Sequence, residues 1–555
     1  MTTVREAAFA MWRERGMTTI FGNPGSTELP MLADFPEDFR YVLALQEAVA
    51  VGMADGFAQA SGAPAHVNLH TAPGVGNGMG AIFNAQANKT PLLVTAGQQA
   101  RSLMTLQANL TNRDAARMPE PLVKWSYEPP RAQDVPHALA RATHLAALPP
   151  RGPVFVSIPM DDWGAEIDEA AVAHQTRRRV TGVAAADPAA VRALAQRLTA
   201  ARRPVLVTGP DVDASGAWDA AVALAERLRL AVWAAPAPGG GRLGFPEDHP
   251  AFQGILPPAI GPLAETLGGH DLVLVAGSSV FPYYPNIPGP LLPEGTELVA
   301  ITSDPDEAAR APMGDAIVAD VRLTLEALLA EVERGGEGVA GGGMAGEGGV
   351  GEAATGGGPR EAPPRRPEPE APPETDPMHA GAAVDALAEV FPADGIVVLE
   401  SPSATLAVRN RLRLGRPGSY YFGAGGGLGF GLAASIGVQL AQPDRPVVCV
   451  VGEGSAQYAI QGLWTAAAHD VPVTFLVLRN EEYAILKWFA GLEAVEGAPG
   501  LDLPRLDCVA VASGYGVPSR RADGREELAG ALAEALAAEG PRLVETRVAP
   551  GMALG

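Results

Sequence analysis

Two oxygen-bearing side chains, Glu453 and Asn480, follow two apolar runs whose composition is typical of buried strands. The runs cover residues 447–451 and 473–478, and continuous apolar strands of this kind are buried on both faces of a parallel sheet. Because ligands of such sheets lie beyond the carboxyl ends of the strands, we expect the two side chains to converge on one point. Carboxylate and amide oxygens suit a hard divalent cation, usually magnesium, that carries a diphosphate. The alternative is an ordinary strand, turn and helix in which Glu453 caps the helix.

Glycines flank Glu453 on both sides. Gly452 and Gly454 let backbone N–H groups approach phosphate oxygens, and Ser455 follows in the same turn. A helix expected from about Ala456 offers its N-terminus to the same anion. The motif therefore predicts a phosphate-binding turn beside the cation.

Three further polar side chains stand at the ends of predicted strands in the N-terminal part of the chain. Ser26, Glu47 and His70 each follow such a strand. Each has a local explanation, as a helix cap, a first-turn acid stabilised by the helix dipole, and a turn histidine. Together they occupy the strand ends at which α/β sheets bind ligands, so we expect them on one rim of a sheet.

Composition excludes several classes of function. A chain of 555 residues is too long for one core and predicts about three or four domains. The net charge of −22 argues against nucleic acid or an anionic membrane as a partner. The two cysteines, Cys449 and Cys508, give neither a disulfide framework nor a zinc site, so we expect a cytoplasmic location. No stretch has signal-peptide or membrane-spanning character.

Alternating strand and helix patterns divide the chain into domains of one fold class. We expect an α/β protein with three doubly wound parallel-sheet domains at 1–179, 180–330 and 379–555. Residues 331–378 are rich in glycine and then in proline and contain no aromatic residue. Such a stretch buries too little surface to order itself, so we expect a disordered linker there.

The C-terminal motif resembles the diphosphate motif of thiamine-diphosphate enzymes. That family has aspartate where Glu453 stands and usually a second asparagine where Arg479 stands, next to Asn480. Glutamate is one methylene longer than aspartate, and magnesium tolerates displaced ligands poorly. We therefore expect Glu453 to weaken or alter the metal preference of the site.

The N-terminal motifs are similar to the pyrimidine-binding domain of the same family, in particular of its 2-oxo acid decarboxylases and, among these, the benzoylformate decarboxylases. The segments that carry this likeness are 22–26, 46–48, His70 and 121–128. The resemblance covers nearly the whole chain except the predicted linker.

This resemblance implies thiamine diphosphate and Mg²⁺ (or Ca²⁺) as cofactors, and it assigns residues to them. The implied catalytic side chains are Glu47, His70, Ser26 and Tyr284, the last where close relatives carry a catalytic histidine. The implied cofactor-binding residues are Asn23, Pro24, Gly25, Glu47, Ser403, Gly426, Leu428, Gly452, Gly454, Ser455 and Tyr483. The implied metal ligands are Glu453, Asn480 and the backbone carbonyl of Glu482. The implied substrate pocket is lined by Leu110, Phe422, Ile485 and Phe489.

The activity implied is the non-oxidative decarboxylation of a small 2-oxo acid, such as the aryl glyoxylate benzoylformate, to an aldehyde and carbon dioxide. One alternative is a carboligase or lyase of 2-hydroxy ketones, favoured by Tyr284 in place of histidine. Another is a cofactor-binding paralogue of low turnover, favoured by Glu453 and Arg479. Because the family places the two ends of the cofactor on different subunits, we expect at least a homodimer, with a homotetramer as the family's usual state.

Overall fold

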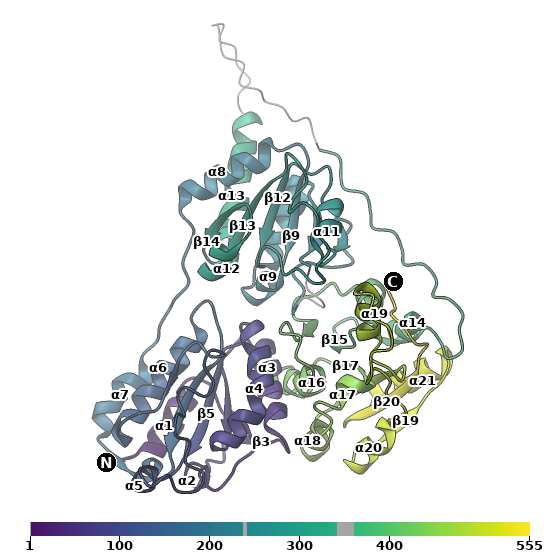
Figure 1. Ribbon diagram of the computed structural model, residues 1–555. Coiled ribbons are helices and arrows are strands. Elements are labelled where there is room, and N and C mark those ends of the chain that lie inside the picture. The colour runs from purple at the N-terminus through teal and green to yellow at the C-terminus, as the bar shows by residue number, and fades with distance from the viewer. Residues whose placement is uncertain (1, 237–240, 341–359, 555) are drawn as a thin grey trace, which may run out of the picture. The chain divides into compact units, whose positions relative to one another are not determined.

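Three sheets dominate the computed structural model, which describes residues 2–236, 241–340 and 360–554. In these ranges each of the three sheets has six strands, and their strands pair in parallel (Figure 1). The expected α/β class with three parallel-sheet domains is confirmed. The chain forms two compact units: Met1–Gly182, Ala371–Leu412 and Tyr421–Gly555 form the first, and Val183–Glu370 with Arg413–Tyr420 the second. None of the helices in the described ranges has both the length and the apolar character that crossing a bilayer requires.

The N-terminal domain orders its sheet β3-β2-β4-β5-β7-β6. Its strands are β2 (Thr19–Gly22), β3 (Arg40–Leu43), β4 (Ala65–Leu69), β5 (Leu92–Gln98), β6 (Ser126–Tyr127) and β7 (Val154–Pro159), and β1 (Thr2–Thr3) pairs separately with β8 (Glu166–Ile167). Its helices are α1 (Val4–Glu14), α2 (Leu29–Leu32), α3 (Glu47–Ser61), α4 (Thr71–Ala87), α5 (Arg101–Met104), α6 (Val135–Ala147) and α7 (Glu169–Arg177), with 3₁₀ turns at Ala132–Asp134 and Asp162–Gly164. Helix α1 begins at a capping box, in which the side chains of Thr3 and Glu6 each accept a backbone N–H of the other residue.

The C-terminal domain orders its sheet β16-β15-β17-β18-β20-β19. Its strands are β15 (Ile396–Glu400), β16 (Tyr420–Phe422), β17 (Val447–Gly452), β18 (Val473–Arg479), β19 (Ser519–Arg521) and β20 (Arg542–Arg547). Its helices are α14 (Ala380–Val390), α15 (Thr405–Leu412), α16 (Phe430–Ala441), α17 (Glu453–Ala456), α18 (Gly462–Ala468), α19 (Ala484–Leu492), α20 (Cys508–Gly514) and α21 (Arg525–Leu536). Because Gly452 pairs with Leu478, β17 and β18 end at the same edge of the sheet, as predicted.

The prediction of a helix that starts at about Ala456 is wrong in where the helix begins and ends. The backbone becomes helical already at Glu453, α17 ends at Ala456, and the helix resumes only with α18. Between them the N–H groups of Tyr458 and Ala459 bond to carbonyls three residues back, which makes tighter turns than an α-helix. A Cβ at Gly462 would lie 2.7 Å from Leu432 Cδ2, so this break brings the chain very close to α16.

Small residues join the N- and C-terminal domains within the first unit. Helices α3 and α16 cross so closely that a Cβ at Gly56 would lie 2.2 Å from the Ala434 carbonyl oxygen. A Cβ at Gly437 would lie 1.8 Å from the Met53 carbonyl oxygen. The glycines are therefore required by the helix contact, and one hydrophobic core continues across it.

The central domain forms the second unit and orders its sheet β11-β10-β9-β12-β13-β14. Its strands are β9 (Pro204–Thr208), β10 (Ala231–Ala234), β11 (Phe252–Ile255), β12 (Leu272–Ala276), β13 (Glu297–Thr302) and β14 (Asp315–Val318). Its helices are α8 (Pro188–Ala200), α9 (Pro210–Ala214), α10 (Trp218–Leu228), α11 (Ile260–Thr266), α12 (Pro305–Arg310) and α13 (Val321–Ala340).

The stretch expected to be a disordered linker makes contacts with the central domain. Helix α13 continues to Ala340, and residues 341–359 lie outside the described part of the chain. The Arg360 guanidinium donates to the carbonyls of Ala201 at 2.8 Å, Leu228 at 3.0 Å and Thr199 at 3.1 Å. These carbonyls end α8 and α10, where a cation is stabilised by the helix dipoles. The prediction of a disordered linker is therefore wrong for the residues around Arg360, which contact the central domain.

Candidate active site

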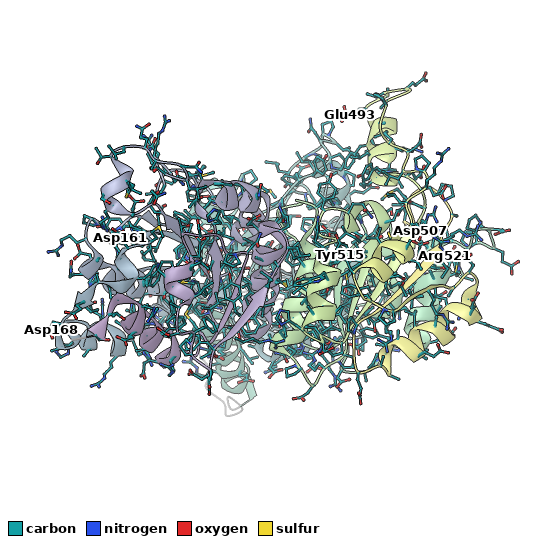
Figure 2. All side chains as sticks on the ribbon, turned by 90° about the horizontal axis from the view of Figure 1, so that it is seen from below. Asp161, Asp168, Glu493, Asp507, Tyr515 and Arg521 are labelled. Carbon is teal, nitrogen blue, oxygen red and sulfur yellow. The ribbon has the colours of Figure 1, made fainter. Side chains whose placement is uncertain are left out.

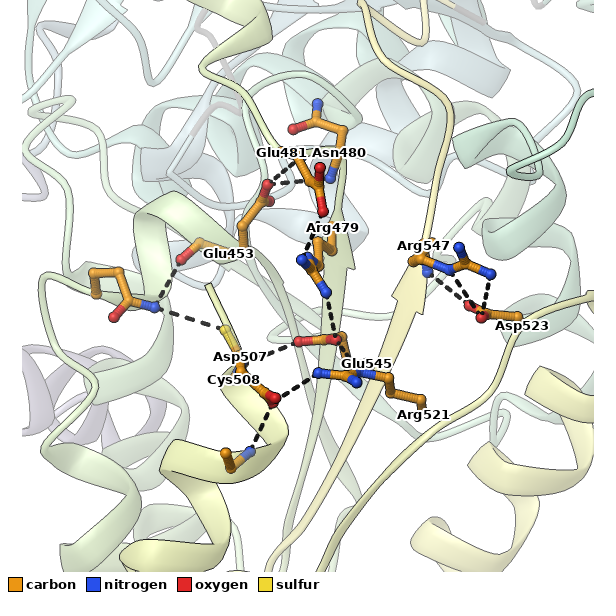
Figure 3. Close-up of polar contacts among 12 residues, drawn as sticks. Glu453, Arg479, Asn480, Glu481, Asp507, Cys508, Arg521, Asp523, Glu545 and Arg547 are labelled. Carbon is orange, nitrogen blue, oxygen red and sulfur yellow. Dashed lines mark hydrogen bonds and ion pairs between the residues drawn. The ribbon is translucent and has the colours of Figure 1, made fainter. Parts of the chain in front are cut away.

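The Glu453 carboxylate contacts the backbone of the loop that begins at Asn480, where β17 and β18 end at one edge of the sheet (Figure 3). One carboxylate oxygen of Glu453 accepts the backbone N–H groups of Asn480 at 3.1 Å and Glu481 at 2.6 Å. The carboxyl is buried, and burial raises its pKa, while the backbone donors oppose that shift. Glu453 therefore does not merely cap a helix, since its carboxylate joins two neighbouring strand ends.

The oxygen donors carried by Glu453 and the loop 480–482 are of a type that suits a divalent cation, and the Asn480 amide oxygen accepts the Glu482 N–H at 3.2 Å. The Glu453 carboxylate, the Asn480 amide oxygen and the Glu482 carbonyl oxygen are hard oxygen donors of the kind that magnesium and calcium bind. The Glu482 carboxylate is occupied elsewhere, because it pairs with Lys487 and accepts the Gly551 N–H at 2.7 Å. A buried carboxylate is costly without a compensating positive charge, and a cation held here would supply that charge.

A glycine-rich segment around Leu428 is fixed from the C-terminal domain by Glu400. The Glu400 carboxylate accepts N–H groups from Gly429 at 2.7 Å, Gly431 at 2.9 Å and Phe430 at 3.2 Å. The first N–H groups of a helix have no partner within the helix itself, so a carboxylate at the start of α16 satisfies them and is stabilised by the helix dipole. Burial raises the pKa of Glu400 to about 7, against the effect of these donors. Sequence reasoning did not assign Glu400 a role, although it directly follows a predicted strand.

The same segment is fixed on its other side by helix α4 of the N-terminal domain. Asn84 donates to the Gly427 carbonyl at 2.8 Å and accepts the Gly427 N–H at 3.0 Å. Asn88, one turn later, accepts the Ala424 N–H at 2.9 Å. Leu428 therefore lies between two sets of side-chain contacts to its neighbouring backbone. These pairings link residues far apart in the chain, and no local pattern indicates them.

Glu47 opens α3 as expected, behind a cap formed by the Gln46 side chain. The Glu47 carboxylate is largely buried and accepts the amide of Asn77 at 3.0 Å and that of Asn23 at 3.3 Å. Each carboxylate oxygen thus has one amide donor, which fixes its direction. Asn77 on α4 is a further site residue that sequence reasoning did not assign.

His70 stands at the end of β4 and is paired with a buried acid. Its Nδ1 lies 2.8 Å from the Glu28 carboxylate and 3.2 Å from the Thr27 hydroxyl. Glu28 is 1% exposed and also accepts the N–H groups of Gly25 at 2.7 Å and Gly97 at 2.8 Å. Because both side-chain contacts of the ring use Nδ1, Nε2 is the nitrogen that can face a ligand.

Ser26 is exposed and does not cap the next helix. Helix α2 begins at Leu29 with Glu28 in the cap position and no side-chain capping bond, so the explanation of Ser26 as a cap is wrong. Glu28 is the residue of this turn that sequence reasoning missed. The available signal was an acid two positions beyond Ser26 in a turn that follows a buried strand.

The other residues assigned from the resemblance lie in both units. Gly426 adopts φ +75 with open space around it, and Gly454 packs against the Tyr483 ring, where a Cβ would lie 2.7 Å away. The remaining cofactor-site residues in the first unit, in whole or in part buried, are Pro24, Ser403, Leu428 and Ser455. Phe422 is buried, and Leu110, Ile485 and Phe489 are half-buried, so the pocket that they were assigned to stays a prediction. Tyr284 is 59% exposed on the second unit, and its role also stays a prediction.

Models of thiamine pyrophosphate enzymes match three segments of the chain. The N-terminal TPP binding domain matches residues 2–118, the central domain residues 191–328 and the C-terminal TPP binding domain residues 403–546. The matches therefore include Glu28, Glu47 and His70 at one end and Glu453 and Asn480 at the other.

Individual relatives are similar over the full length of the chain. A benzoylformate decarboxylase of Pseudomonas aeruginosa is 50% identical over 545 residues, which is 98% of each chain. The crystal structure of a benzoylformate decarboxylase from Polynucleobacter necessarius has a TM-score of 0.92 and 41% identity, covering 100% of this chain and 99% of that one. A thiamine diphosphate-dependent 4-hydroxybenzoylformate decarboxylase of Rhodococcus jostii has a TM-score of 0.92 and 42% identity, covering 100% of both chains.

Proposed function

The chain belongs to the thiamine pyrophosphate enzyme family and is a benzoylformate decarboxylase-like carboxy-lyase, and we propose that its substrate is an aryl glyoxylate such as benzoylformate. The products are then an aromatic aldehyde and carbon dioxide. The observation that carries this proposal is the 50% identity to a benzoylformate decarboxylase across 98% of both chains. Two further features support it: the hydrogen-bonded pair of Glu28 and His70, and Glu47, whose carboxylate accepts hydrogen bonds from Asn23 and Asn77. Both place a group that can transfer protons in a fixed position.

When bound, thiamine diphosphate supplies a carbanion that adds to a ketone and accepts the electrons that carbon dioxide leaves behind. Glu47 would hold a proton at the aminopyrimidine ring, with Asn23 and Asn77 keeping its carboxylate in place. His70 would bind the substrate carboxylate and return a proton through Nε2, since Glu28 holds its Nδ1. Ser26 is assigned to the same substrate carboxylate.

We assign the diphosphate to Gly452, Gly454 and Ser455, and the cation, Mg²⁺ or Ca²⁺, to Glu453, Asn480 and the Glu482 carbonyl. The convergence of Glu453 with the Asn480 loop supports this assignment. Because glycine has no Cβ, Gly452 and Gly454 would let phosphate oxygens approach the backbone closely at the first turn of α17.

The active enzyme is proposed to be at least a homodimer, with a homotetramer as the expected state. Support comes from large apolar side chains that the first unit exposes, because a subunit interface would bury such side chains. They are Leu29, Phe83, Leu106, Tyr458 and Leu486. Light scattering coupled to size exclusion measures this state directly, and a purely monomeric enzyme with full activity would contradict it.

A second candidate activity is carboligation of aldehydes to 2-hydroxy ketones. The observation that favours it is Tyr284, because it stands where close relatives carry a catalytic histidine and a phenol is a poor proton carrier at neutral pH compared with imidazole. Tyr284→His is then expected to raise aldehyde release relative to acyloin formation. An unchanged product ratio in this variant would remove Tyr284 from the site.

The substrate proposal is tested with a panel of 2-oxo acids, each incubated with enzyme, thiamine diphosphate and Mg²⁺. We expect kcat/KM for benzoylformate and its 4-hydroxy derivative to exceed that for pyruvate and for branched aliphatic 2-oxo acids. Faster turnover of an aliphatic acid would overturn the aryl specificity, and binding of cofactor without any carbon dioxide release would favour a paralogue of low turnover.

A further inference from the structure

Glu481 is a strained residue inside the proposed metal loop. It has φ +61, in the left-handed region that L-residues with a side chain disfavour. It stands between Asn480 and Glu482, which are both assigned to the cation. In this conformation the Glu481 N–H group donates to the carboxylate of Glu453, the other proposed metal ligand, at 2.6 Å. The left-handed backbone of Glu481 thus accompanies the contact between the loop and Glu453. A residue with a side chain keeps this left-handed backbone conformation only where neighbouring contacts stabilise it.

Arg479, the last residue of β18, makes the contact that stabilises Glu481. Its guanidinium donates to the Glu481 carboxylate at 2.6 Å and lies 3.5 Å from the Glu545 carboxylate (Figure 3). Glu545 pairs with Val477 across β18 and β20, and side chains two apart on a strand share a face, so Arg479 and Glu545 lie on the same face. Arg479 is therefore directed along the sheet toward Glu545.

Glu545 is a fixed anchor for this arginine. Its side chain is 0% exposed and also pairs with Arg521 at 2.7 Å and accepts the Cys508 N–H at 3.2 Å. Arg521 in turn pairs with Asp507 at 2.7 Å, and Figure 2 shows these two side chains close together on the C-terminal domain. A buried carboxylate with several fixed donors moves little, so it gives Arg479 a rigid support.

We propose that Arg479 is a positioning residue for the metal site. It bridges the buried Glu545 and the strained Glu481, and so keeps the loop in the conformation that brings Asn480 and Glu482 to Glu453. This inference rests on the cofactor site proposed above and assigns a use to the arginine that stands where the family usually has asparagine. A structural role alone would affect only stability, whereas a positioning role must also affect the binding of metal and cofactor.

The experiment compares Arg479→Gln with Arg521→Gln. Both variants remove one cationic partner of Glu545, but only Arg479 also contacts the loop. Apo-enzyme is titrated with thiamine diphosphate at several fixed Mg²⁺ concentrations, and binding is followed by calorimetry and tryptophan fluorescence. Melting temperatures are measured without cofactor. We expect Arg479→Gln to weaken Mg²⁺-dependent cofactor binding by about tenfold, as the loss of a charged hydrogen bond does, while Arg521→Gln binds like wild type.

A second substitution tests the mechanism itself. Glycine adopts positive φ without support, so Glu481→Gly in the Arg479→Gln background is expected to restore most of the lost affinity. Arg479→Lys, which keeps the charge toward Glu545, serves if Arg479→Gln does not fold, and is expected to lose affinity in the same direction but less. Wild-type binding in the Arg479 variants, equal losses in Arg521→Gln, or no rescue by Glu481→Gly would each overturn the inference. A wild-type enzyme that does not bind thiamine diphosphate at all would overturn the proposed function instead, and the inference with it.

Discussion

One carboxylate oxygen of Glu453 accepts hydrogen bonds from the loop that carries Asn480 and Glu481. This contact gives the extra methylene of glutamate, relative to aspartate, a structural use. From the resemblance to an aspartate-bearing family we expected Glu453 to weaken or alter the metal preference of the site. In the structure, the length of the side chain is used to reach two loop N–H groups, at 3.1 and 2.6 Å. The loop is therefore fitted to glutamate.

We accordingly predict that Glu453→Asp weakens cofactor binding. The shorter side chain loses one or both N–H contacts, and the expected loss is about tenfold in affinity. The measurement is a titration of apo-enzyme with thiamine diphosphate at fixed Mg²⁺, Mn²⁺ and Ca²⁺. Tighter Mg²⁺-dependent binding in the aspartate variant would instead support the original expectation that Glu453 weakens the metal preference of the site.

Glu47→Gln is predicted to separate binding from turnover. Glutamine keeps the shape of the side chain but loses the charge and the ability to hold and release a proton. We expect kcat to fall by about 10²- to 10⁴-fold, the usual range for a general acid–base group, with cofactor affinity changed little. The matched control is Glu37→Gln, an acid of the same type at an exposed position. Full turnover in Glu47→Gln would remove Glu47 from the mechanism.

At the scale of elements, strand ends were predictable and the contacts that fix their side chains were not. The apolar runs before Glu453, Asn480, Glu47 and His70 placed these residues correctly, because a buried parallel strand has a recognisable composition. Glu28 and Glu400 stand next to predicted strands, but a single sequence does not show which groups they contact. Asn77 and Asn84 contact residues distant in the chain, and no local pattern indicates these pairs. The break between α17 and α18, next to the close approach of Gly462 to α16, likewise has no signal in the local sequence.

Glu400, the last residue of β15, binds N–H groups at the start of α16 through its carboxylate and gives a pH prediction. Its pKa is raised to about 7 in the folded protein, above the value of 4.5 expected when unfolded. Between these values the folded state keeps a proton that the unfolded chain has released, so this group loses stabilising effect as the pH rises through about 7. The stability of wild type relative to Glu400→Gln should fall by roughly 1 to 3 kcal/mol between pH 4.5 and 8. Denaturant unfolding of both proteins across this range measures it, and a pH-independent difference would contradict the shifted pKa.

At the scale of the whole molecule, Arg360 fastens the stretch after α13 to the central domain. Its contacts revise our expectation of a disordered linker for the residues around Arg360. We predict that Arg360→Ala lowers the stability of the central domain by about 1 kcal/mol, the usual size of a cation's effect at helix C-termini. Arg365→Ala, at an exposed position in the same segment, is the control. Equal melting curves for Arg360→Ala and wild type would show that the contacts do not stabilise the domain.

The central claim is that the chain is a thiamine-diphosphate-dependent decarboxylase of aryl glyoxylates, and product stoichiometry tests it most directly. Apo-enzyme is given benzoylformate with and without thiamine diphosphate and Mg²⁺, and carbon dioxide, benzaldehyde and acyloin are measured together. The account predicts equal amounts of carbon dioxide and benzaldehyde, formed only when the cofactor is present and nearly absent in Glu47→Gln. Carbon dioxide release without added or bound thiamine diphosphate, or no release with it, would contradict the account.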